Sequence, residues 1–85
     1  MTRYLIEFER IGRNHGVPPV TVEANGEADL CRQIRAVARK HLASPSFDVL
    51  LEYAEDGETV IAGWFACGMH SGGNFAVTAR AGEAA

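Results

Sequence analysis

A single amphipathic helical segment lies between two groups of strand-like segments, and this pattern limits the chain to few folds. Across residues 27–42, apolar side chains recur at helical spacing and arginines occupy the opposite side. Asn25–Gly26 precedes the segment as a turn and N-cap, and residues 44–46, Ser-Pro-Ser, end it. A helix with one apolar side covers one face of a sheet, which predicts an α+β fold. The residues expected to face the sheet are Leu30, Ile34, Val37, Ala38 and His41.

The remaining segments alternate between apolar and polar side chains, as half-buried strands do. Two precede the helix and three follow it, which predicts the order β-β-α-β-β-β, with one helix packed on one face of an antiparallel or mixed sheet. Residues 12–19 form a loop between the first two strands, and residues 71–74, Ser-Gly-Gly-Asn, are expected to turn the chain into the last strand. The expected strands are 4–11, 20–24, 47–53, 59–67 and 75–80.

Length and composition predict one domain. A chain of 85 residues, 47% of them apolar, holds one core, which we place in residues 1–80, with 81–85 as a flexible tail. No run approaches the roughly 20 apolar residues that span a bilayer, and Glu7 and Glu9 interrupt the apolar start before it forms a signal peptide. Cys31 and Cys67 lie in apolar stretches, as expected of thiols in a reducing compartment. We therefore expect a cytoplasmic protein.

Alternating strand directions bring three connections to one end of the predicted sheet. These are the loop 12–19, the end of the helix and the turn before the last strand, and they carry cationic, amide and imidazole side chains. The candidate binding residues at this end are Arg13, Asn14, His15, Arg39, Lys40, His70 and Asn74. The acidic residues Glu27, Asp29, Asp56 and Glu58 are expected at the opposite end.

A second candidate surface is the sheet face that the helix leaves uncovered. The segment 59–67 is apolar on both faces, with Trp64 and Phe65 pointing in opposite directions, so one aromatic should be exposed there. Mixed with Glu7, Glu9, Glu52 and Thr78, this patch suits self-association or protein binding. Scattered apolar residues on an ordinary surface are the alternative interpretation. The candidate residues are Leu5, Ile11, Leu50, Trp64 and Phe65.

Nucleic-acid binding is the alternative function. The basic residues Arg13, Arg32, Arg35, Arg39 and Lys40 are placed to contact phosphates through the helix face and the loop end. Exposed arginines are also common on solvated helices, and the net charge of −3 is unlike that of most nucleic-acid-binding domains. The aromatic residues fall in strands, where core packing explains them without a base-stacking role.

No catalytic or metal-binding signature accompanies these surfaces. Cys67 and His70 have Cys-x-x-His spacing, but no second ligand pair repeats it. Neither Cys67 nor Ser71 has a base that a third group would orient. The Ser71-Gly72-Gly73 segment lacks the lysine of a phosphate-binding loop. We therefore expect no enzyme, no cofactor and no metal site.

Two segments carry a family resemblance. Residues 8–15, Phe-Glu-Arg-Ile-Gly-Arg-Asn-His, and 68–75, Gly-Met-His-Ser-Gly-Gly-Asn-Phe, resemble those of small uncharacterised accessory proteins of bacteriophages that infect actinobacteria. The resemblance covers most of the chain and implies a phage protein made inside a bacterial host, where such proteins often bind host factors. It assigns no chemistry to any residue. Residues 3–9 are also similar to the first strand of HicB-like antitoxins, but the following loop and the two-strand finish depart from that pattern.

These observations together predict a small non-enzymatic protein-interaction module. Its expected partner is a host protein or a second copy of the chain, as a homodimer. Nucleic acid is the alternative partner, and no membrane or small-molecule partner is predicted.

Overall fold

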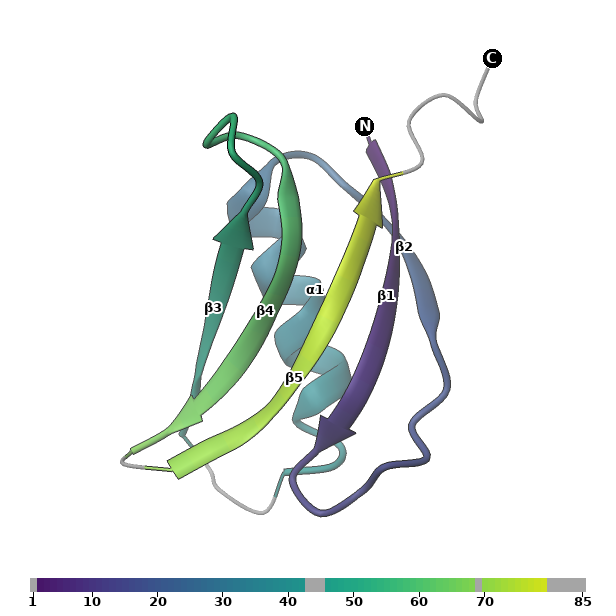
Figure 1. Cartoon of the computed structure of the whole chain (residues 1–85). Helices are drawn as coiled ribbons and strands as arrows, with labels where there is room; N and C mark the ends of the chain where they lie inside the picture. The colour runs from purple at the N-terminus through teal and green to yellow at the C-terminus, as the bar shows by residue number, and fades with distance from the viewer. Residues whose placement is uncertain (1, 43–45, 69, 80–85) are drawn as a thin grey trace.

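The computed structural model places one helix against one five-stranded antiparallel sheet, which confirms the predicted α+β class (Figure 1). It describes residues 2–42, 46–68 and 70–79, so the predicted tail 81–85 lies outside the described residues. Across the sheet, the strands follow the order β2-β1-β5-β4-β3, and each neighbouring pair is antiparallel. The elements are β1 (Thr2–Ile11), β2 (Val20–Ala24), α1 (Glu27–Ala38), β3 (Asp48–Tyr53), β4 (Val60–Cys67) and β5 (His70–Ala79).

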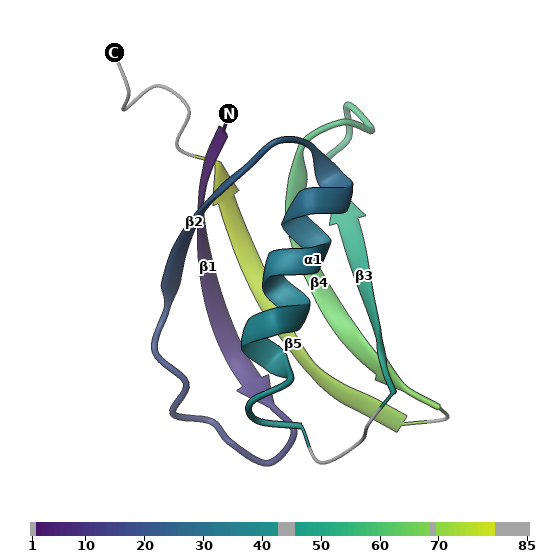
Figure 2. The same cartoon turned by 180° about the vertical axis from the view of Figure 1, so that it is seen from behind.

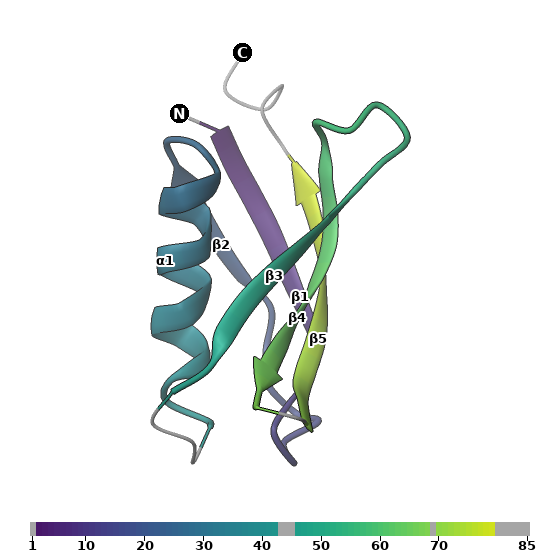
Figure 3. The ribbon, with the colours of Figure 1, turned by 90° about the vertical axis from the view of Figure 1, so that its left-hand side faces the viewer.

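The helix connects the two edges of the sheet. β2 and β3 run in the same direction at opposite edges, and α1 crosses one face between them (Figure 2). With α1 toward the viewer, β3 lies to the right of β2, which is the right-handed sense that such crossovers adopt. Figure 3 shows the helix on one side of the sheet, and no other described element covers the opposite face.

The apolar side of α1 is buried against the sheet. Leu30, Ile34 and Ala38 follow one another at a spacing of four and are at most 1% exposed. His41 was expected on the same side, but it is exposed because the helix ends at Ala38. The His41 amide bonds to the Ala38 carbonyl, three residues back, which tightens the chain into turns. Arg39 is the C-cap and Lys40 follows the helix, so the predicted end near residue 42 is too late.

Phe65 lies at the centre of the core. It is 0% exposed, and its ring centroid lies 5.2 Å from that of Phe75, 6.0 Å from that of Phe47 and 6.4 Å from that of Phe8. Aromatic pairs at such distances contribute about 0.5–1.5 kcal/mol each beyond the burial of their surface. The cluster therefore joins β1, β4, β5 and the start of β3 beneath the helix.

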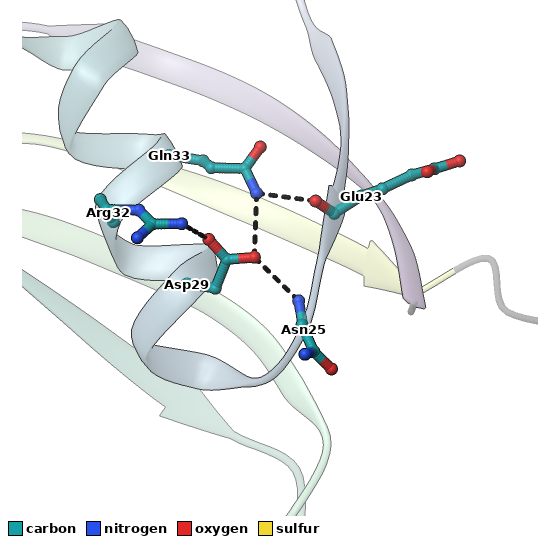
Figure 4. A network of polar contacts seen from close by, with 5 residues as sticks. All are labelled: Glu23, Asn25, Asp29, Arg32 and Gln33. Atoms are coloured by element: carbon teal, nitrogen blue, oxygen red, sulfur yellow. Dashed lines mark hydrogen bonds and ion pairs between the residues drawn. The ribbon is translucent and has the colours of Figure 1, made fainter.

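A group of polar contacts fixes the start of α1 against the end of β2 (Figure 4). The backbone N–H of Asn25 donates a hydrogen bond to Asp29 Oδ2 at 2.9 Å, and the side-chain Nε2 of Gln33 donates to the backbone carbonyl of Glu23 at 2.7 Å. Gly26, the N-cap residue, has no side chain that accepts a hydrogen bond from the helix. Asp29 instead supplies an acceptor from the first turn and ties that turn to the preceding strand.

A bulge in β1 reverses the side to which its last residue points. The register with β5 shifts between Phe8 and Arg10, so Glu9 is an extra residue. Strict alternation places Ile11 on the uncovered face, but the bulge turns its side chain inward. Ile11 is 0% exposed and belongs to the core, so its assignment to the uncovered face is wrong.

β5 begins at His70, and the predicted turn at residues 71–74 is wrong. These residues pair with both β4 and β1. The hairpin turn comes before these residues, between Cys67 and His70, which pair with each other at the ends of β4 and β5. The glycines serve close packing in this segment, because a Cβ at Gly73 would overlap the carbonyl oxygen of Arg10 on β1.

Replacing Gly73 with alanine should destabilise the fold strongly. The new Cβ would collide with the Arg10 carbonyl, and the φ of +128° is unfavourable for a residue with a side chain. We expect the free energy of unfolding to fall by about 3 kcal/mol or more, from overpacking and backbone strain together. Gly68→Ala is the control: its φ is +65° but its Cβ would meet nothing within 4 Å, so it should lose about 1–2 kcal/mol. Equal losses in urea denaturation would contradict this packing.

The contribution of Asp29 to stability should depend on pH. The hydrogen bond from the Asn25 amide is the main cause that holds the pKa of the Asp29 carboxyl below its ordinary value. Because the folded pKa is the lower one, the carboxylate stabilises the fold above the unfolded pKa of about 4 and loses this effect as pH falls through the folded value. Asp29→Asn should therefore lower Tm at about pH 7 and lower it less at about pH 3.

Calorimetry of Asp29→Asn and of Glu55→Gln checks this dependence. Glu55 is exposed in the β3–β4 turn, so its replacement should change Tm little at either pH. A Tm deficit of Asp29→Asn that stays constant with pH would show that the carboxylate charge is not what stabilises the helix start.

Candidate functional site

The uncovered side of the sheet forms the first candidate surface, called the open face. Residues paired across antiparallel strands share a face, so the register assigns its members. Leu50 pairs with Trp64, and Trp64 pairs with Asn74. The centre of the open face comprises Leu50, Ala62, Trp64, Asn74 and Ala76, and its margin comprises Arg3, Leu5, Glu7, Glu9, Arg10, Asp48, Glu52 and Thr78.

Trp64 and Phe65 point to opposite sides of β4. Phe65 is in the core, whereas Trp64 is half-buried on the open face. Of the residues predicted for the uncovered face, Leu5, Leu50 and Trp64 lie there. The other two, Ile11 and Phe65, are core residues and are removed from this surface.

An apolar patch occupies the part of the open face next to the β3 edge. It centres on the paired residues Leu50, 39% exposed, and Trp64, and Ile61, 45% exposed, lies three residues before Trp64 on β4. Ile61 is the extra residue where the β3–β4 register shifts, and it is not among the residues that pack against the core. Strict alternation puts Ile61 on the same side as Phe65, and no glycine or proline marks the shift. Its exposure is therefore not evident from the sequence.

Carboxylates surround the apolar patch. Asp48 and Glu52 lie two residues before and after Leu50, on the same side of β3. On the far side of the patch, Glu9 Oε2 accepts a 2.7 Å hydrogen bond from the Asn74 side-chain amide. Arg10, which pairs with Asn74, is a cation on the same side, so the open face is apolar near its β3 edge and carries more carboxylates than cations around that patch.

The outward side of α1 forms the second candidate surface, called the basic stripe. Its five residues are Arg32, Arg35, Ala36, Arg39 and Lys40, which line a hollow of about 450 Å³. Their positions lie along one ridge of the helix surface and its C-terminal continuation. Four of the eight Lys and Arg residues of a chain with net charge −3 therefore border one depression. Within the described residues, no acidic side chain lines it.

Two arginines of the basic stripe are held by the protein itself. Arg32 forms an ion pair with Asp29, its neighbour one turn earlier. Arg35 donates to the Phe47 carbonyl at 2.7 Å, and its guanidinium carbon lies 5.3 Å from the centroid of the Phe47 ring. This contact with the aromatic face fixes the Arg35 side chain beside the hollow.

The remaining cations are exposed. The side chains of Arg39 and Lys40 form no hydrogen bond or ion pair with any residue that the structure describes. Arg13, the fifth residue predicted for nucleic-acid binding, is also exposed but lies in the loop 12–19 and does not line the hollow. The predicted basic set therefore divides into a stripe of four residues and one residue elsewhere.

The third predicted surface, at the loop end of the sheet, has dispersed members. The loop 12–19, the end of α1 and the β4–β5 turn lie at one end of the molecule (Figure 1). Asn14 Nδ2 lies 3.4 Å from His41 Nδ1. Asn14 Oδ1 accepts a hydrogen bond of 2.9 Å from the backbone N–H of Gly16 in the same loop. His15 and His70 are exposed, and Asn74 belongs to the open face. Asn14 thus organises its loop, and the structure does not assemble these residues into one site.

Among the described residues, no three His, Cys, Asp or Glu side chains lie close enough together to hold a metal ion. The Cys-x-x-His spacing is that of a tight hairpin, because Cys67 and His70 pair across the β4–β5 turn. Both cysteines are free thiols, and partial burial raises the pKa of Cys31, which keeps that thiol protonated near neutral pH. In the part of the chain that the structure describes, α1 is too short and too polar to cross a bilayer.

Comparisons with family models, curated proteins and solved structures give no significant match to this chain. The open face and the basic stripe are therefore the features from which its function is inferred. They lie on opposite sides of the molecule and carry opposite charge.

Trp64, the single tryptophan of the chain, should report the acidity around the apolar patch. Carboxylates concentrate cations and repel anions, so caesium should quench its fluorescence more than iodide does, relative to a free tryptophan amide. The preference should shrink near 1 M salt, where the screening length is about 3 Å. Glu52→Gln should weaken it, whereas Glu58→Gln in the β3–β4 turn should not. If the two ions quench Trp64 equally at low salt once each is divided by its quenching of the free tryptophan amide, the open face is not acidic.

Proposed function

We propose that this chain is a small non-enzymatic interaction module that binds a protein through its open face. The observation that carries the proposal is the apolar patch of Leu50, Ile61 and Trp64, on a sheet face that no described element covers. Burial of such side chains by a partner releases hydration water and is the main favourable term in protein association. Apolar side chains clustered on neighbouring strands and rimmed by polar groups favour a contact site over an ordinary surface.

The charge around the patch specifies the chemistry of the partner. Asp48, Glu52 and Glu9 border it, so the best-fitting partner buries an apolar or aromatic anchor against Trp64 and places lysine or arginine around that anchor. Opposite charges would speed association and select the partner. The apolar contact would supply most of the affinity.

The charges on β3 disfavour a dimer in which two copies of the chain pair edge to edge beside the open face. Consider β3 pairing with β3 of another copy so that the two Leu50 side chains are opposed. Asp48 of each chain would then lie across from Glu52 of the other, and like charges in opposed positions destabilise such a pair. Charged side chains of this kind protect an edge strand from self-association. We therefore propose a different protein as the partner and keep the homodimer as an outcome of the test.

The resemblance of residues 8–15 and 68–75 to phage accessory proteins suggests where the partner would be found. A phage-encoded module would be made in the cytoplasm of an actinobacterial host, where host proteins are its available partners. A lysate of such a host is therefore the source in which to seek the partner.

The proposal predicts that partner capture depends on the apolar patch. Immobilised protein would be incubated with nuclease-treated host lysate, and bound proteins identified and quantified. Leu50→Ser should lose the captured partner, because it removes an exposed anchor and leaves the core intact. Tyr53→Ser is the matched control: Tyr53 is also 39% exposed but points to the helix side of β3, where its hydroxyl donates to Glu27. It should retain the partner.

Titration with the purified partner gives the quantitative test. Leu50→Ser should weaken the affinity by at least about tenfold, which corresponds to 1.4 kcal/mol. If Tyr53→Ser weakens capture equally, or if no stoichiometric partner depends on Leu50, the open face is not the binding surface. If the wild type dimerises in sedimentation and Leu50→Ser does not, the partner is a second copy of the chain.

A further inference from the structure

The helix side of the molecule suggests a second site, which the protein-binding proposal does not explain. We propose that the basic stripe binds the phosphate groups of a nucleic-acid backbone. Its hollow of about 450 Å³ is lined by Arg32, Arg35, Ala36, Arg39 and Lys40. In the described part of the chain no carboxylate lines that hollow; Asp29 pairs with Arg32 at one end of the row, and Arg35, Arg39 and Lys40 keep their positive charge at the surface that a ligand would meet.

The spacing of the cations suits a regularly charged polymer. Arg32 and Arg39 are seven positions apart, which is about 10 Å along a helix axis. Phosphates recur at short, regular intervals along a nucleic-acid strand, so a row of cations of about 10 Å can contact more than one of them. A ligand with a single phosphate would use only part of the row.

The side chains of the stripe have donors left for a ligand. Arg35 is fixed beside the hollow and uses one of its five N–H donors on the Phe47 carbonyl. Arg39 and Lys40 are exposed, and their side chains have no partner among the described residues. Ala36 lies among the cations that line the hollow and contributes only a methyl group, so the middle of the hollow is open and uncharged.

Helix stability does not account for the whole arrangement. Cations near the C-terminus interact favourably with the helix dipole, which explains part of the preference for Arg35 and Arg39. The dipole does not explain why the cations lie on one ridge of the helix or why, among the described residues, no carboxylate lines the hollow beside that ridge. Arg32 lies in the first half of α1, away from the favourable end of the dipole, and is balanced there by Asp29.

An acidic protein segment is the competing class of ligand. Guanidinium groups bind phosphate oxygens through paired hydrogen bonds, and three of the four cations are arginines. An evenly charged backbone also matches the row of Arg35, Arg39 and Lys40 better than a folded acidic surface does. The acidic open face repels polyanions on the other side of the molecule, so the field of the protein directs them to the basic stripe.

Binding of a fluorescent duplex DNA and of the matching single strand tests the site. Arg32 is neutralised by its own ion pair, which leaves three cations for phosphates. The plot of log K against log salt should therefore have a slope of about −2.7 for the duplex and about −2.1 for the single strand. The form that binds more tightly at equal salt concentration identifies which backbone the stripe prefers, because the slopes differ through the charge density of the nucleic acid. A wild type that binds neither form at low salt would overturn the proposal.

Two matched pairs of variants locate the binding. Ala36 is exposed on the helix, so Ala36→Glu and Ala36→Gln are similar in size and helix propensity and differ in charge. Ala36→Glu should bind about tenfold more weakly than Ala36→Gln, because its carboxylate lies in the middle of the hollow. Arg39→Glu should weaken binding by a similar factor. Arg13→Glu makes the same charge change outside the hollow and should have an effect of less than about twofold.

Equal binding by Ala36→Glu and Ala36→Gln would overturn the assignment, and so would equal weakening by Arg13→Glu and Arg39→Glu. Polyglutamate that competes as well as DNA of equal charge would show that the stripe is a site for acidic protein instead. Leu50→Ser should bind DNA as the wild type does, so the failure of this site and the failure of the protein-binding proposal are separate results.

Discussion

The burial of Phe65 against α1 determines how the rest of the sheet is oriented. Its ring packs with Phe8, Phe47 and Phe75, and its side chain is fully removed from water. Side chains alternate along a strand, so burial of Phe65 turns Trp64 to the side that the helix does not cover. The apolar part of the open face is therefore a direct consequence of core packing, because β4 is apolar on both sides and the helix covers only one of them. A second helix would have buried both aromatics.

The element types and their order are predictable from the sequence because helix and strand have different periods and because turns separate them. The arginines also follow from helical spacing: Arg32, Arg35 and Arg39 fall on one side, and they line one hollow. What strict alternation does not predict are the register shifts. At Glu9 and at Ile61 an extra residue reverses the side of the residues that follow, and neither position has a local marker. Ile11 and Ile61 exchange their expected environments for this reason.

Other features depend on contacts between distant segments. Gly72 and Gly73 look like a turn because two adjacent glycines usually allow one, but the structure uses them to bring β5 close to its neighbours. The loop end shows the same limit. Alternating strand directions predict which end of the sheet a residue occupies, but its position across that end depends on strand order, which no local pattern encodes. His15, His41 and His70 therefore share an end without forming one site.

The position of β5 has a consequence for how the sheet holds together. β5 is the last strand in the sequence, yet it lies in the middle of the sheet between β1 and β4. The pairs β1–β2 and β3–β4 are connected in the sheet only through β5, and isolated hairpins are marginally stable in water. Without β5, the inner edges of β1 and β4 would be unpaired and apolar side chains of the core would be exposed. Open strand edges beside exposed core side chains favour aggregation, so β5 protects both of its neighbours by pairing with them.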